Sequence, residues 1–126
     1  MRKKQVAMVV DDNQMFGDLV SKMLMRQGYD TFFCTNYESA IDVLGRSNVA
    51  LFMADIFMPG MGGIEGIQKI KDLSPRTTII AMSGGWGEMS AKNSVTAARK
   101  IGADACLEKP FTIKDVENTL GSLGTS

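Results

Sequence analysis

Polar side chains with complementary chemistry follow apolar runs at four places in the chain. Asp11 and Asp12 are adjacent, Asp55 has no acidic neighbour, and Ser83 and Lys109 come later. Adjacent carboxylates repel, and burying one is costly unless a cation offsets its charge. Aspartate oxygens suit Mg²⁺, which takes one or two carboxylates together with phosphate oxygens. These residue types therefore predict a magnesium site that handles a phosphoryl group.

Asp55 is the candidate nucleophile of this site. A carboxylate can accept a phosphoryl group as an acyl phosphate, and Ser83 and Lys109 can donate hydrogen bonds to the phosphoryl oxygens. Each residue also has an ordinary explanation when taken alone. The Asp11–Asp12 pair could cap a helix, and Lys109 could be a solvated surface lysine. The combination favours the phosphoryl-handling site.

Apolar runs alternate with amphipathic segments along the whole chain, which predicts five β–α units. Strands are expected at residues 5–10, 31–34, 49–54, 77–82 and 103–107. Such alternation in a short chain indicates an α/β fold, a doubly wound parallel sheet with helices on both faces. The carboxyl ends of parallel strands share one edge, where ligands bind. The candidate residues should therefore meet at that edge.

The helices between these strands are expected to turn an apolar stripe to the sheet. Predicted stripe residues are Phe16, Leu19, Val20, Met23, Leu24, Ala40, Ile41, Leu44, Ile64, Ile67, Ile70, Ile113, Val116 and Leu120. A weaker helix is expected at 88–101. Asn36 and Thr112 are candidate N-caps, and Gly28 and Gly45 are candidate C-terminal residues.

Length and composition limit the function classes. The 126 residues suit a single domain, 1–126, with a frayed tail at about 121–126. A formal net charge of zero argues against direct nucleic-acid binding. No apolar run approaches a membrane span and no signal peptide is recognised, so a cytoplasmic protein is expected. The absence of histidine excludes Ser-His and Cys-His catalysis and phosphotransfer through a histidine of this chain.

Four motifs together resemble the receiver domain of two-component response regulators. They are VVDDN, LFMADIFMPGMGG, IIAMSGG and ADACLEKPF, and the resemblance extends to about residue 120. It implies the flavodoxin-like (βα)5 fold with strand order 2-1-3-4-5. The resemblance is to stand-alone receivers of the chemotaxis-regulator type. The sequence leaves open whether it belongs to a longer chain that carries an output domain.

The resemblance also implies roles for the site residues. Asp55 would be the phosphoacceptor, and Ser83 and Lys109 would bind the phosphoryl group. Mg²⁺ would be held by Asp12 directly, by Asp11 largely through water, by Asp55, and by the backbone carbonyl of Phe57. The Lys109–Pro110 peptide bond would be cis, aiming the lysine into the site.

The implied function is a signalling switch. A sensor histidine kinase or phosphotransfer protein would donate the phosphoryl group, and the domain would catalyse its own phosphorylation and dephosphorylation. The fourth helix, fifth strand and fifth helix would then change their contact with a downstream protein. A phosphorelay intermediate or phosphate sink is the alternative within this class.

The sequence departs from the usual pattern at three places. Cys106 stands where a Tyr or Phe is common, so we expect Trp86 or its loop to take over the readout. Phe57 and Gly85 occupy the positions that tune hydrolysis, and neither can orient a water, so slow self-dephosphorylation is expected. Ser83 replaces the commoner threonine and keeps the hydroxyl.

Two functions of other classes compete with this reading. A flavin-binding electron carrier would need a phosphate-binding loop after the first strand, where DDNQMFG is acidic and would repel the phosphate. An aspartyl phosphatase or phosphotransferase would carry an acid two residues after its nucleophile, where this chain has Phe57.

Overall fold

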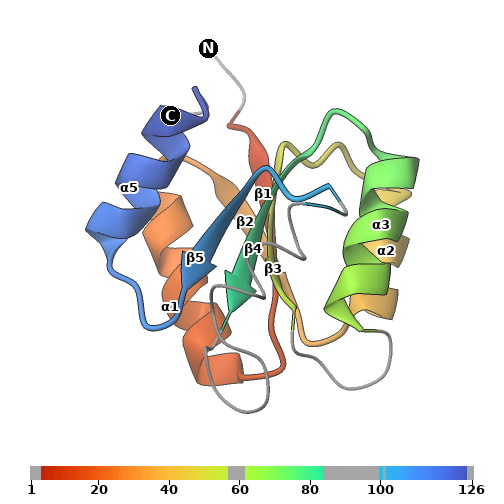
Figure 1. Ribbon diagram of the computed structural model, residues 1–126, viewed down its shortest axis with the longest axis horizontal. Coiled ribbons are helices and arrows are strands. Elements are labelled where there is room, and N and C mark those ends of the chain that lie inside the picture. The colour runs from red at the N-terminus through yellow and green to blue at the C-terminus, as the bar shows by residue number, and fades with distance from the viewer. Residues whose placement is uncertain (1–3, 57–61, 84–99, 101, 125–126) are drawn as a thin grey trace.

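A computed structural model describes residues 4–56, 62–83, 100 and 102–124. Its five strands form one parallel sheet in the order β2-β1-β3-β4-β5, as predicted (Figure 1). The strands are β1 (Val6–Val10), β2 (Asp30–Cys34), β3 (Leu51–Asp55), β4 (Thr78–Ser83) and β5 (Ala105–Glu108). Each lies within two residues of its expected position at either end. The predicted helix at 88–101 lies almost entirely outside the described residues.

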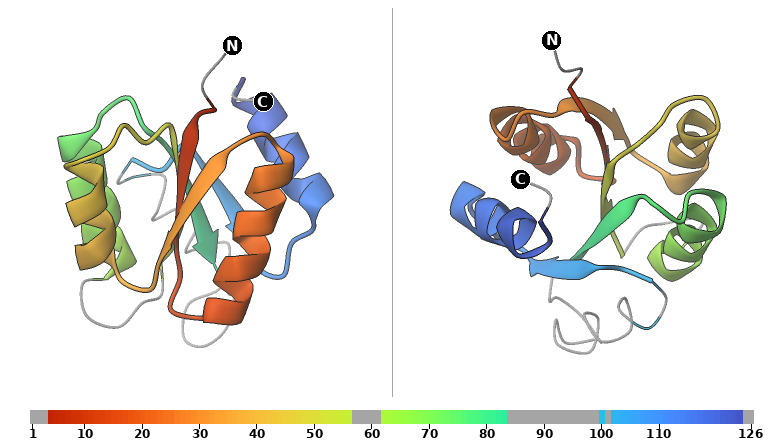
Figure 2. Two further views of the ribbon diagram at one scale, coloured as in Figure 1. Left: turned by 180° about the vertical axis from the view of Figure 1, so that it is seen from behind. Right: turned by 90° about the horizontal axis from the view of Figure 1, so that it is seen from above.

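Four described helices cover the two faces of the sheet (Figure 2). On one face lie α1 (Gln14–Arg26) and α5 (Ile113–Ser122), and on the other lie α2 (Tyr37–Leu44) and α3 (Gly63–Leu73). Because α5 continues to Ser122, the first two residues of the expected frayed tail are helical. None of the helices in the described ranges combines the length and the apolar character that crossing a bilayer requires.

The predicted helix caps are present. The side chain of Asn36 accepts a hydrogen bond from the backbone N–H of Ser39, and Thr112 forms a capping box with Asp115 at the start of α5. Gly28 follows α1 with φ +96°, a conformation that glycine adopts without steric penalty. Gly45 ends α2 with ordinary right-handed dihedrals. These local interactions fix where each helix begins and ends.

Two apolar clusters, one on each face of the sheet, hold the helices against the sheet. The alternation of side chains along β1 divides them: Met8 and Val10 face α2 and α3, whereas Ala7 and Val9 face α1 and α5. Every residue of β3 is buried, as expected for a central strand covered on both sides. The site-bearing ends of the strands therefore rest on a rigid, close-packed layer.

Two residues of the predicted apolar stripes are largely exposed instead. Leu19 is 48% exposed and lines a groove between α1 and α5, because the two helices do not close over it. Ile64 is 42% exposed, because α3 turns Gly63, Gly66 and Ile67 toward the sheet, together with Ile70 one turn later. Apolar spacing alone did not reveal that glycines form part of the buried face of α3.

Candidate functional site

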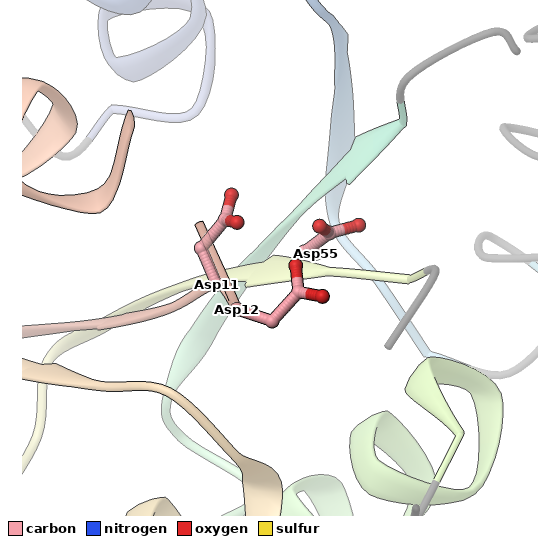
Figure 3. Close-up of side chains that lie close together, drawn as sticks. All are labelled: Asp11, Asp12 and Asp55. Atoms are coloured by element: carbon pink, nitrogen blue, oxygen red, sulfur yellow. The ribbon is translucent and has the colours of Figure 1, made fainter. Parts of the chain in front are cut away.

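Three aspartates meet at the carboxyl edge of the sheet (Figure 3). Asp11 and Asp12 follow β1, and Asp55 is the last residue of the neighbouring strand β3. Asp11 and Asp55 are buried and Asp12 is exposed, yet carboxylate oxygens of all three lie within 4.8 Å of one another. The predicted convergence is therefore present in the fold. The hard oxygen donors and their excess negative charge fit a divalent cation such as Mg²⁺.

Lys109 supplies the only positive charge that an ion pair brings to this cluster in the part of the chain that the structure describes. Its Nζ lies 2.7 Å from Oδ2 of Asp11 and 3.0 Å from Oδ2 of Asp55. Burial by itself would lower the pKa of Lys109. Hydrogen bonds and charge from Asp11 and Asp55 outweigh burial and raise the pKa above its ordinary value. One ammonium against three carboxylates leaves room for a second cation.

The start of α1 orients the first acid and the lysine. The N-cap of α1 is Asn13, whose backbone N–H donates to Oδ1 of Asp11 at 2.9 Å. This assigns capping to Asn13 and leaves Asp11 facing Lys109. One turn later, the centroid of the Phe16 ring lies 4.6 Å from Nζ of Lys109, and the ring packs edge-on against Phe111. The ammonium is thus held by two carboxylates and an aromatic face.

Ser83 ends β4, the strand next to β3. Its Oγ is buried and has no hydrogen-bond partner among the described residues. A buried hydroxyl without a partner is energetically unfavourable, so such an atom points to a ligand that completes its hydrogen bonding. An anionic oxygen held near Asp55 would do so.

A buried tyrosine that the sequence analysis did not single out also reaches this edge. The Tyr37 hydroxyl donates to the backbone carbonyl oxygen of Asp55 at 2.6 Å. Burial, reinforced by the negative charges of Asp55 and Asp11, raises the pKa of Tyr37 far above its ordinary value, so the hydroxyl keeps its proton. Its aromatic residue type signals only core packing, and nothing local to Tyr37 indicates a partner 18 residues away.

Some of the remaining predicted residues lie in the described part of the chain, and others do not. The Lys109–Pro110 bond is cis, as the resemblance implied. Cys106 lies in β5 and packs against the cluster beneath α2 and α3. Phe57, Gly85 and Trp86 lie outside the described residues, so the backbone-carbonyl ligand, the positions that tune hydrolysis and the aromatic readout stay predictions.

The chain is similar in sequence to a known domain family and to several characterised proteins. Residues 7–120 match the profile of the response regulator receiver domain. The autoinducer 1 sensor kinase/phosphatase LuxN of Vibrio harveyi is 35% identical over 91% of this chain, which spans only 13% of LuxN. Sporulation initiation phosphotransferase F of Bacillus subtilis is 26% identical over 90% of this chain and 88% of that protein.

A solved structure agrees with the fold. The CheY-like receiver domain protein of Methanospirillum hungatei superposes with a TM-score of 0.84 at 24% identity, covering 96% of this chain and 94% of that one. At this identity the likeness concerns the arrangement of strands and helices.

Proposed function

Because the chain belongs to the response regulator receiver domain family of two-component signalling, we propose that Asp55 is its phosphoacceptor. The donor is a sensor histidine kinase or a phosphotransfer protein in the cytoplasm. The observation that carries the proposal is the convergence of Asp11, Asp12 and Asp55 with Lys109, whose ammonium contacts two of the acids.

The residues of the chain divide the chemistry between them. An Asp55 carboxylate oxygen attacks the donor's phosphorus, and the bond from phosphorus to the donor breaks. Lys109, already 3.0 Å from Asp55, and the unpartnered Ser83 hydroxyl donate to the phosphoryl oxygens. Asp11, Asp12 and Asp55, with the Phe57 carbonyl, would hold Mg²⁺. When bound, Mg²⁺ offsets the negative charge that these acids and the phosphoryl oxygens bring together.

The first experiment incubates the purified chain with Mg²⁺ and acetyl phosphate and records its intact mass. We expect one added phosphoryl group, lost after Asp55→Asn and in the presence of a chelator. Asp18→Asn is the matched control, because Asp18 is an exposed acid of α1 outside the acidic cluster. Labelling that survives Asp55→Asn would rule out Asp55 as the acceptor.

Two downstream functions are candidates for the phosphorylated domain. In the first, the surface of the fourth helix, β5 and α5 changes its contact with a downstream protein. In the second, the domain passes the phosphoryl group along a relay, and the likeness to a phosphotransferase over 88% of that relative favours it. Mixing the labelled chain with a purified histidine phosphotransfer domain separates the two, since only a relay transfers the label to histidine.

A further inference from the structure

The peptide unit that follows the proposed phosphoacceptor is held at both ends. This unit joins Asp55 to Ile56. Its N–H belongs to Ile56 and donates to the carbonyl oxygen of Met82 in β4 at 3.1 Å. Its carbonyl oxygen belongs to Asp55 and accepts the 2.6 Å hydrogen bond from the Tyr37 hydroxyl. The unit is thus attached to a neighbouring strand on one side and to the first residue of α2 on the other.

The orientation of that peptide plane affects the direction of the Asp55 side chain. Because the plane is hydrogen-bonded at both ends, it fixes the backbone dihedral ψ of Asp55 and the position of the Cα from which the side chain leaves β3, relative to β4 and α2. Lys109 holds the carboxylate at its other end, 3.0 Å away. Phosphoryl transfer requires the attacking oxygen to be aligned with the phosphorus, and small misplacements of reacting atoms slow such steps strongly.

Two glycines of α3 make this tyrosine contact possible. A Cβ at Gly66 would lie 2.3 Å from Cδ1 of the Tyr37 ring, which is far inside van der Waals contact. A Cβ at Gly63 would lie 2.2 Å from Cα of Ile56, the second residue of the same peptide unit. The helix therefore lies directly against both the ring and the peptide unit. Tyr37 is 1% exposed, so its side chain is enclosed by the protein.

We propose that Tyr37 is a positioning residue for phosphoryl transfer, which acts by fixing the backbone of Asp55 from α2. The proposal rests on the proposed role of Asp55 as phosphoacceptor. Tyr37 touches neither the phosphorus nor the leaving group: the Asp55 oxygen forms the new bond to phosphorus, and the donor atom, the imidazole nitrogen of a phosphohistidine or the carboxylate oxygen of acetyl phosphate, leaves with the electron pair. The contribution of Tyr37 is alignment, maintained by one hydrogen bond and by the close contact with Gly66.

The test compares Tyr37→Phe with Tyr29→Phe. These are the only two tyrosines of the chain. Both are buried, but Tyr29 packs in the cluster beneath α1 and α5 and precedes β2, at the opposite edge of the sheet. Both substitutions remove one hydroxyl and keep the ring. The rate of phosphorylation is measured by intact mass over a range of acetyl phosphate concentrations at saturating Mg²⁺.

We expect Tyr37→Phe to lower the maximal rate by about fivefold or more while the half-saturating acetyl phosphate concentration stays close to that of the wild type. Tyr29→Phe should change neither. A thermal melt of each variant records the loss of stability separately. The ¹³C resonance of the Asp55 carbonyl should move in Tyr37→Phe and stay in Tyr29→Phe, which tests the hydrogen bond independently of the rate.

The possible outcomes are distinguishable. A lower melting temperature with an unchanged maximal rate would make Tyr37 a structural residue only and overturn the positioning role. A wild-type chain that takes up no phosphoryl group under any of these conditions would overturn the proposed function, and the positioning role with it. A maximal rate lowered equally by both substitutions would also contradict it, because the effect would then be one of general core packing.

Discussion

At the scale of single residues, the stability of the site depends on how the charges of its buried side chains are balanced. Asp11 and Asp55 are taken out of water, and the ammonium of Lys109 is their shared partner. Removing one member of such a group leaves an uncompensated buried charge, which is more costly than the ion pair is favourable. The lysine therefore has a structural role before any phosphoryl group arrives.

The raised pKa values at the site predict a loss of stability at alkaline pH. The pKa values of Tyr37 and Lys109 are both higher in the folded chain than their ordinary values of about 10 and 10.4. Above about pH 10 the unfolded chain loses these protons while the folded chain keeps them. The unfolded state then binds fewer protons, so the free energy of unfolding falls with rising pH, by up to about 1.4 kcal/mol per pH unit for each group.

Urea unfolding between about pH 8 and pH 11, in the presence of a chelator, measures this slope. The Tyr37→Phe variant has no ionisable group at this position, so its free energy of unfolding should fall less steeply above about pH 10 than that of the wild type. The contribution of both groups is fully present at neutral pH. Identical slopes in the two proteins would show that Tyr37 does not keep its proton in the folded state.

At the scale of elements, α2 and α3 pack unusually closely at the ends that face the site. A tyrosine on one helix fills the space that a glycine on the other leaves, and a second glycine admits the backbone after β3. Glycine inside a helix is normally unfavourable by up to about 1 kcal/mol relative to alanine. Its presence at Gly66 therefore reflects the tertiary contact with Tyr37.

Gly66→Ala should destabilise the fold by about 1–3 kcal/mol, because the added methyl group overlaps a fully buried ring and this outweighs the gain in helix propensity. Chemical denaturation measures the change. Gly121→Ala is the matched control: Gly121 is an exposed position in α5 with no atom near its added methyl group, and the substitution should stabilise by about 0.5–1 kcal/mol.

A double-mutant cycle tests whether the ring is the cause. In a Tyr37→Ala background the ring is absent, so adding Gly66→Ala should cost less than it does in the wild type. Equal costs in the two backgrounds would mean that the methyl group clashes with something other than Tyr37.

At the scale of the whole molecule, the doubly wound sheet gathers like charges at one edge. The three acids come from two neighbouring strand ends, and one lysine offsets part of their charge. A cation that binds only the folded chain stabilises it in proportion to the logarithm of its concentration above the dissociation constant. The same acidic cluster should therefore limit stability without metal and increase it with metal.

We expect the melting temperature to rise with Mg²⁺ concentration, with a stabilisation of about 2.7 kcal/mol at 100 times the dissociation constant. Asp12→Asn should remove most of this rise, and in a chelator it should be as stable as the wild type or more so, since one repulsive charge is gone. Asp18→Asn, outside the cluster, should respond to Mg²⁺ as the wild type does. A Mg²⁺ response unchanged by Asp12→Asn would place the cation elsewhere.

Residue order was sufficient to predict the parallel sheet and the meeting of Asp11, Asp12, Asp55 and Lys109, whereas the strand order came from the resemblance to receiver domains. Alternating apolar runs and amphipathic segments define β–α units locally, and a parallel sheet must bring its strand ends to one edge. The motifs themselves lie next to the strands that position them. None of this required knowledge of how one helix packs on another.

Contacts between helices could not be read in the same way. Leu19 has the spacing of a core residue yet borders an open groove, and Gly66, with no side chain, belongs to the buried face of α3. Tyr37 acts on a backbone oxygen, and a backbone oxygen leaves no trace in residue type. The hydrogen bond from α2 to Asp55 depends on the distance between packed elements, which the three-dimensional fold sets and residue spacing along the chain does not.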